Sequence, residues 1–218
     1  MNFGVLGTGM VGQAIGGKLV ELGHQVMMGS RGAGNEKAVA WVSDAGEGAS
    51  EGSFADAAGF GEVVVNATAG SASLEALEAA GASNLAGKIL IDVANPLDFS
   101  QGMPPTLTVC NDDSLGERIQ GAFPDARVVK TLNTVNASVM IAPGDLGETT
   151  SIFVCGNDAD AKDRVTELLR TFGWGEENVM DLGDISAARG AEMYLPLWLR
   201  LYGALGTGSL NIAIVRGD

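Results

Sequence analysis

Short apolar runs alternate with segments of helical periodicity along this 218-residue chain. Some runs, such as residues 63–65 and 89–91, are apolar at every position, which is typical of strands buried on both faces of a parallel sheet. Strand–helix alternation of this kind predicts an α/β chain with a Rossmann fold, a doubly wound and mainly parallel sheet followed by a small helical C-terminal portion. Strands are expected at residues 2–6, 25–28, 62–66, 88–92, 127–131, 150–155 and 178–182.

Apolar residues at three-to-four spacing predict helices between these strands, at residues 10–22, 34–45, 71–82, 112–123 and 159–172. We expect small-residue loops at residues 45–53 and 70–73, and a long surface loop at residues 98–110. Residues 187–216 are interpreted as a largely apolar helical tail interrupted by glycines. The Pro143-Gly144 segment suggests a division into a dinucleotide-binding domain, residues 1–145, and a small C-terminal domain, residues 146–218, that contacts substrate or a second subunit.

A glycine pattern follows the first predicted strand directly. Residues 7–12 read Gly-Thr-Gly-Met-Val-Gly, which is G-x-G-x-x-G placed between a strand and a helix, with a second strand after it. This is the setting that a dinucleotide fingerprint requires. Gly7 is expected to form the tight turn, Gly9 to admit a pyrophosphate and Gly12 to let helix and strand pack closely. Free amides at the helix start would then bind the phosphates.

The end of the second strand indicates which dinucleotide binds. An NAD site usually has an acidic residue there for the ribose hydroxyls. This chain instead has Ser30 and Arg31, and the first acidic residue after them is Glu36. A hydroxyl and a guanidinium suit a 2′-phosphate, and Lys37 is a candidate second cation. The sequence therefore favours NADP(H).

Three loops at the carboxyl ends of predicted strands, residues 66–71, 92–97 and 130–136, are expected to form the ligand crevice. They carry amides, hydroxyls and small residues, and Asp92 and Lys130 are their only charged members. Those two side chains could pair structurally or act chemically, and both interpretations stay open. The only histidine, His24, is placed at the opposite edge of the sheet. No general acid is evident, so we assign no catalytic side chain, and direct hydride transfer between two stacked rings makes the smallest demand on the protein.

Composition excludes several other classes. A formal net charge of −14 disfavours nucleic-acid binding and an anionic membrane surface. One histidine and two cysteines without C-x-x-C spacing disfavour a metal site and a disulfide framework. No targeting segment or apolar stretch of about 20 residues is present in this sequence, so a cytoplasmic protein is expected.

A resemblance to a known family begins at the glycine turn and Gly29-Ser30-Arg31, and it continues through residues 128–134 and 154–158. It reappears in the tail at residues 189–192 and 205–210. In these segments the chain resembles the NADPH-dependent coenzyme F420 reductase family, the F420H2:NADP oxidoreductases, and more distantly the oxidoreductase domain of the STEAP ferric reductases.

The resemblance implies a dimeric enzyme that binds NADP(H), with the deazaflavin of coenzyme F420 stacked on the nicotinamide. By position, the pyrophosphate would contact Thr8, Gly9, Met10 and Val11. The 2′-phosphate would contact Ser30, Arg31 and Lys37, and the nicotinamide would be lined by Ala67, Thr68, Ala94 and Asn95. The second substrate would contact Asn133, Thr134, Leu205, Gly206 and Thr207.

Two alternatives remain open at this point. One is an NADPH-dependent reductase of a flavin or of a small imine or carbonyl compound. The other is a non-catalytic NADP(H)-sensing module whose C-terminal helix contacts a partner. We interpret that apolar helix, which contains Trp198, Leu199 and Tyr202, as core or dimer interface rather than as a platform for a ring.

Overall fold

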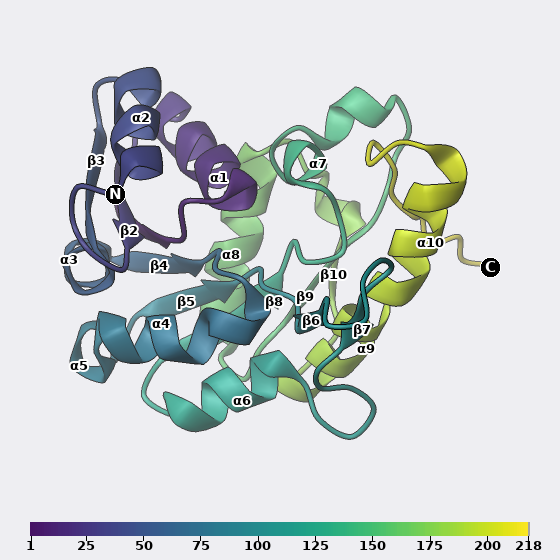
Figure 1. Cartoon of the computed structure of the whole chain (residues 1–218). Coiled ribbons are helices and arrows are strands. Elements are labelled where there is room, and N and C mark those ends of the chain that lie inside the picture. The colour runs from purple at the N-terminus through teal and green to yellow at the C-terminus, as the bar shows by residue number, and fades with distance from the viewer. Residues whose placement is uncertain (218) are drawn as a thin grey trace.

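A computed structural model describes residues 1–217 (Figure 1). Its centre is a sheet of eight strands in the order β10-β9-β8-β5-β4-β1-β2-β3. These strands are β1 (Asn2–Leu6), β2 (Gln25–Ser30), β3 (Ala49–Ser53), β4 (Val63–Asn66), β5 (Ile89–Asp92), β8 (Arg127–Thr131), β9 (Ile152–Cys155) and β10 (Val179–Asp181). All neighbouring pairs are parallel except β8 and β9. The predicted doubly wound, mainly parallel sheet is confirmed.

Helices cover both faces of the sheet (Figure 1). They are α1 (Met10–Glu21), α2 (Glu36–Ala45), α3 (Phe54–Phe60), α4 (Ser73–Ala80), α5 (Ala82–Leu85), α6 (Leu115–Ala122), α7 (Ala137–Ile141), α8 (Ala159–Thr171), α9 (Ala188–Met193) and α10 (Leu195–Leu205). One core lies between the sheet and α1, α2, α7 and α8, and a second lies beneath α3, α4, α6 and α9. Successive residues of β4 and β5 enter opposite cores, which explains why both strands are apolar throughout.

The structure corrects three sequence expectations. Residues 45–53 were expected to be a loop, but Ala49–Ser53 forms strand β3, which pairs with β2 at the edge of the sheet. Ser53 then caps α3 in a reciprocal capping box with Asp56, and this short helix was not predicted. The expected surface loop at residues 98–110 contains one strand of a small antiparallel hairpin, β6 (Leu97–Asp98) and β7 (Thr106–Leu107).

The apolar tail is shorter as a helix than the sequence suggested. Helix α10 ends at Leu205, because Gly206 adopts a left-handed conformation with φ of 69°. The following residues return to the start of β9, where Ser151 N donates to Ile212 O at 2.9 Å and Asn211 Nδ2 donates to Ser151 O at 2.9 Å. Residues beyond the predicted boundary at 145 thus supply strands β9 and β10 of the same sheet. No helix in the described residues combines the length and the hydropathy needed to cross a membrane.

Candidate functional site

The glycine turn connects β1 to α1 with almost no space between backbones. A Cβ atom at Gly7, where φ is 118°, would lie 2.5 Å from the carbonyl oxygen of Ala67. A Cβ atom at Gly12 would lie 2.1 Å from the carbonyl oxygen of Gly7. At Gly9, by contrast, a Cβ atom would meet nothing within 4 Å. Gly7 and Gly12 therefore permit close packing, and Gly9 faces open space.

The start of α1 has no side-chain cap. Gly9 is its N-cap residue, and the first intrahelical bond runs from Gln13 N to Gly9 O at 3.0 Å. Helices α2, α6 and α8 are instead capped by the side chains of Asn35, Ser114 and Asp158. The first amides of α1 are thus available to a ligand, and the positive end of the helix dipole favours an anionic one.

A cavity of about 630 Å³ lies in front of this turn, and we call it the glycine-turn cavity. Its lining includes Gly7, Thr8, Gly9, Ser30 and Arg31. Ser30 is buried, and its hydroxyl donates to Gly32 O at 2.6 Å, which shapes the loop after β2. Arg31 is exposed and forms no salt bridge within the described residues.

Two residues beside this loop differ from the sequence picture. Lys37 is exposed near the start of α2 and is not part of the cavity lining, so its contact with a 2′-phosphate remains a prediction. Glu51 of β3 was not predicted to take part, yet both of its carboxylate oxygens accept from Gly34 N, at 3.1 and 3.0 Å. It fastens the loop that carries Arg31. This residue could be found only once β3 was known to be a strand beside β2.

A second cavity, of about 560 Å³, adjoins the first through Ala67, Thr68 and Ala69, which line both. We call it the strand-end cavity, because it lies at the carboxyl ends of β4, β5 and β8. It brings together seven of the predicted site residues: Met10, Val11, Ala67, Thr68, Ala94, Asn95 and Asn133. Helix α10 contributes Leu195 together with Trp198, Leu199 and Tyr202. The last three were interpreted from the sequence as core or dimer interface. Every lining residue is uncharged.

Other predicted contacts of the second substrate lie apart from this cavity. Thr134 is buried, and its hydroxyl has no hydrogen-bond partner within the described residues. Leu205, Gly206 and Thr207 are exposed at the end of α10 and do not line the strand-end cavity. Their role remains a prediction.

Paired amides fix one wall of the strand-end cavity. Asn95 Nδ2 donates to Asn133 O at 2.8 Å, and Asn133 Nδ2 donates to Asn95 Oδ1 at 3.0 Å. Asn133 Nδ2 also donates to Ala191 O at 3.1 Å, which joins this wall to α9. The loops after β5 and β8 and the helix preceding α10 are therefore held in one arrangement.

Three ionic side chains are completely buried behind this wall. Lys130 Nζ lies 2.8 Å from Asp92 Oδ2 and 2.9 Å from Glu192 Oε1, and it also donates to Ala94 O. We call Asp92, Lys130 and Glu192 the buried ionic cluster. Burial alone would lower the pKa of Lys130, but the two carboxylates outweigh it and raise that pKa. The structural pairing of Lys130 with Asp92 is confirmed, and Glu192 is a third member that the sequence analysis missed.

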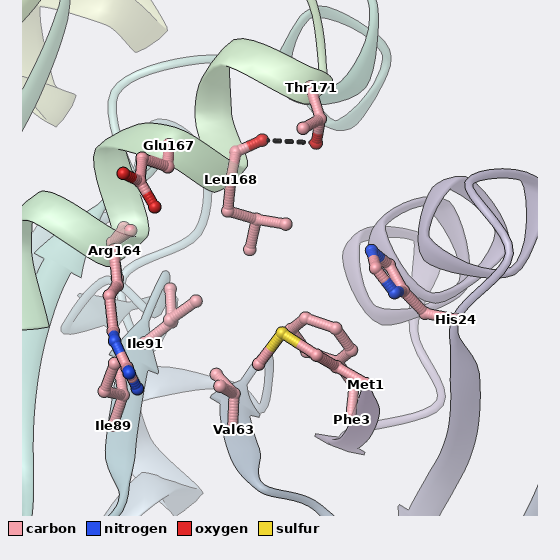
Figure 2. Close-up of a pocket in the computed structure, with 11 residues that line it drawn as sticks. Met1, Phe3, His24, Val63, Ile89, Ile91, Arg164, Glu167, Leu168 and Thr171 are labelled. Atoms are coloured by element: carbon pink, nitrogen blue, oxygen red, sulfur yellow. Dashed lines mark hydrogen bonds between the residues drawn. The ribbon is translucent and has the colours of Figure 1, made fainter.

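His24 lies at the turn before β2, at the edge opposite the strand-end cavity, as predicted. It borders a separate apolar pocket of about 390 Å³, which Figure 2 shows with Met1, Leu168 and Arg164 around it. Partial burial, together with the nearby α-amino group, lowers the pKa of His24. His24 lines neither the glycine-turn cavity nor the strand-end cavity, so it is not placed to act as an acid or base in them.

The remaining candidates for chemistry give no further site. Burial raises the pKa of the Cys155 thiol to about 12, whereas Cys110 is exposed. No group of three metal-ligating side chains occurs among the residues that the structure describes.

Comparison with known proteins gives consistent matches. The model of the family NADP oxidoreductase, coenzyme F420-dependent, matches residues 2–96. The crystal structure of a provisionally named F420-dependent NADP-reductase from Arthrobacter sp. FB24 is 54% identical, with a TM-score of 0.94 over 99% of this chain and 100% of that one.

More distant relatives share part of the chain or the fold. Metalloreductase STEAP3 of Rattus norvegicus is 30% identical over 203 residues, which are 89% of this chain but only 37% of that protein. A reductive aminase from Aspergillus terreus shares the fold, with a TM-score of 0.65 and 19% identity over 94% of this chain and 62% of that one. The glycine turn, the Ser30-Arg31 loop and the full-length match to the Arthrobacter structure lead to one assignment: the chain belongs to the family of coenzyme F420-dependent NADP oxidoreductases.

Proposed function

We propose that this chain transfers a hydride directly between NADP(H) and a second ring cofactor, most favourably coenzyme F420. The observation that carries the proposal is the pair of adjoining cavities. One presents uncapped helix amides with Ser30 and Arg31, and the other is an uncharged chamber beside it. The shared lining of Ala67 to Ala69 would let a dinucleotide lie across both.

The residues present fit NADP(H). The open space at Gly9 and the free amides of α1 would receive the pyrophosphate, while Arg31 would hold the 2′-phosphate. The Ser30 hydroxyl would join Arg31 on turning its hydrogen from Gly32 O to the phosphate. Ala94, Asn95 and Thr68 would line the nicotinamide. When bound, the nicotinamide supplies or accepts the hydride, and the protein aligns the two rings and excludes water.

The strand-end cavity also suits the flat part of a deazaflavin. Its α10 side carries Trp198 and Tyr202, whose rings are stacked with centroids 5.6 Å apart and planes at 10°. No cationic side chain lines the cavity, so the phosphodiester and glutamate tail of coenzyme F420 would lie outside it. Arg200, exposed on α10, is a candidate for contact with that tail.

The direct test mixes the purified protein with NADPH and oxidised coenzyme F420 and follows the visible absorbance of the deazaflavin. We expect that absorbance to fall as NADPH is consumed, and the reverse reaction to restore it with NADP+. No change across a range of pH with protein that binds NADPH would refute coenzyme F420 as the acceptor.

The uncharged lining of the strand-end cavity also supports an alternative set of acceptors. It would accommodate a flavin ring, or a small neutral imine or carbonyl compound, as well as a deazaflavin. NADPH oxidation measured with riboflavin, FMN and a cyclic imine separates these acceptors from coenzyme F420. Tight NADPH binding without turnover of any acceptor would favour the non-catalytic sensing module instead.

A homodimer is also proposed. Helix α10 exposes apolar side chains, with Leu197 56% and Leu205 61% exposed. Because these exposed side chains belong to residues 146–218, the proposed C-terminal domain, the second subunit would contact that domain. Analytical ultracentrifugation of the wild-type chain tests this proposal, and a monomer at micromolar concentration would refute it.

A further inference from the structure

Two members of the buried ionic cluster, Asp92 and Lys130, hold the cavity wall through its backbone. Lys130 donates to the carbonyl oxygen of Ala94, and the amide of Ala94 donates to Asp92 Oδ1 at 3.2 Å. Both polar groups of Ala94 are therefore held by the Asp92–Lys130 pair. Ala94 and the next residue, Asn95, line the strand-end cavity.

A second branch leads from Asp92 to the neighbouring loop. Asn66 Nδ2 donates to Asp92 Oδ1 at 2.9 Å, and Asn66 Oδ1 accepts from the hydroxyl of Thr68 at 2.6 Å. Asn66 is completely buried, whereas Thr68 lines both cavities. Asp92 is thus hydrogen-bonded, directly or through Asn66, to lining residues in the loops after both β4 and β5.

The ammonium group of Lys130 is enclosed by its partners. It donates hydrogen bonds to Asp92 and to the carbonyl oxygen of Ala94, it is ion-paired with Glu192, and its side chain is 0% exposed. None of the three ionic residues lines the cavity. A buried ion pair adds little net stability compared with apolar packing, but its directional bonds hold groups in one geometry.

We propose that Asp92 and Lys130 are positioning residues that set the nicotinamide end of the NADP(H) site, an inference that rests on the proposed function. They act through Ala94 and through Asn66 to Thr68. The predicted ligand is the carboxamide-bearing ring, which needs lining groups held within a fraction of an ångström. In the proposed function the adenosine end of the dinucleotide binds at Ser30 and Arg31. Its binding should therefore not depend on Asp92 or Lys130.

Glu192 supplies a matched control, because its other hydrogen-bond partners, Leu115 and Gly116, do not line the cavity. Its carboxylate accepts from Leu115 N at 2.8 Å and Gly116 N at 3.0 Å, at the start of α6. Asp92→Asn and Glu192→Gln make the same chemical change, and each leaves one carboxylate beside Lys130. They differ in whether the altered group holds the cavity loops or α6.

The experiment measures binding of NADPH and of 2′,5′-ADP, a fragment without nicotinamide, by titration calorimetry with each variant. We expect Asp92→Asn to weaken NADPH about tenfold, the scale of one lost charge-assisted hydrogen bond. It should leave 2′,5′-ADP within about twofold, and Glu192→Gln should leave both ligands within about twofold of wild type. The nicotinamide fluorescence of bound NADPH should change in Asp92→Asn only.

Each outcome decides between the ideas. Equal weakening of NADPH and 2′,5′-ADP by Asp92→Asn, or equal effects of the two variants on NADPH, would overturn the positioning role while the proposed function stands. Failure of wild-type protein to bind either ligand would overturn the proposed function and the positioning role together. If Asp92→Asn does not fold by circular dichroism, Asn66→Ala cuts the branch to Thr68 and carries the same expectation.

Discussion

Replacing Lys130 with Met should reveal how strongly the buried ionic cluster depends on its single cation. The cluster contains one positive and two negative side chains, with Lys130 and Asp92 0% exposed and Glu192 1% exposed. Methionine keeps most of the side-chain volume but leaves both carboxylates unpaired in the interior. Removing one partner of a buried ion pair costs about 3–5 kcal/mol, so we expect a loss at the upper end of that range.

Glu192→Gln should be much milder. This variant keeps the Lys130–Asp92 ion pair, which has no net charge, but loses part of the hydrogen bonding to the start of α6. We expect its free energy of unfolding to fall by about 1–3 kcal/mol. A double variant that combines Lys130→Met with Glu192→Gln leaves only the Asp92 carboxylate unpaired. Its loss of unfolding free energy should therefore be smaller than the sum of the two single losses by about 1 kcal/mol or more.

Urea unfolding followed by circular dichroism measures the free energies of unfolding of the wild type, the two single variants and the double variant. The raised pKa of Lys130 sets the pH window, because a group with a raised folded pKa stabilises fully below its ordinary value of 10.5 and loses that contribution as pH rises through the folded value. As pH rises from neutrality, the difference in unfolding free energy between wild type and Lys130→Met should therefore persist and then narrow in strong alkali. A gap below about 1 kcal/mol at pH 7, or strictly additive losses, would refute this account of the cluster.

Three other predictions concern the glycine turn, the loop after β2 and the thiols. Arg31→Ala should weaken NADPH binding by about 1–3 kcal/mol and leave NADH nearly unchanged in fluorescence titrations, and equal effects on both would disprove the 2′-phosphate contact. Gly12→Ala, whose Cβ would lie 2.1 Å from Gly7 O, should cost about 1–3 kcal/mol of stability by urea unfolding and also weaken NADPH, and wild-type behaviour would contradict the close packing seen at this turn. Cys110 should react with a thiol reagent in the native protein while Cys155, with its pKa raised to about 12, reacts only after unfolding, as mass spectrometry of the labelled peptides would show; rapid native labelling of Cys155 would contradict its burial.

The central strands could be predicted because every residue in their core segments is apolar. Residues 63–65 and 89–91 have no polar position to confuse the pattern, and the glycine turn has fixed spacing. Strand β3 could not be recognised from Ala49–Ser53, which is small and polar, because its pairing with β2 at the sheet edge is what makes it a strand.

The lining of the strand-end cavity was predictable where loops follow strands and unpredictable where a helix distant in the sequence contributes to it. Ala67, Thr68, Ala94 and Asn95 follow parallel strands, whose ends must meet at one edge. The apolar face of α10 could have packed on a core, a partner or a cavity, and periodicity does not distinguish these. Glu192 joins Lys130 only through tertiary packing, so no local pattern could reveal it.

The return of the chain to β9 has a mechanical consequence for the wall formed by α10. That helix is fastened before its start, where Asn133 holds Ala191, and again after its end, where Ser151 and Asn211 stitch residues 211–214 to the sheet. The backbone on both sides of α10 is therefore hydrogen-bonded to other parts of the fold. Displacing the wall beside Trp198 would require breaking these hydrogen bonds at one end or the other.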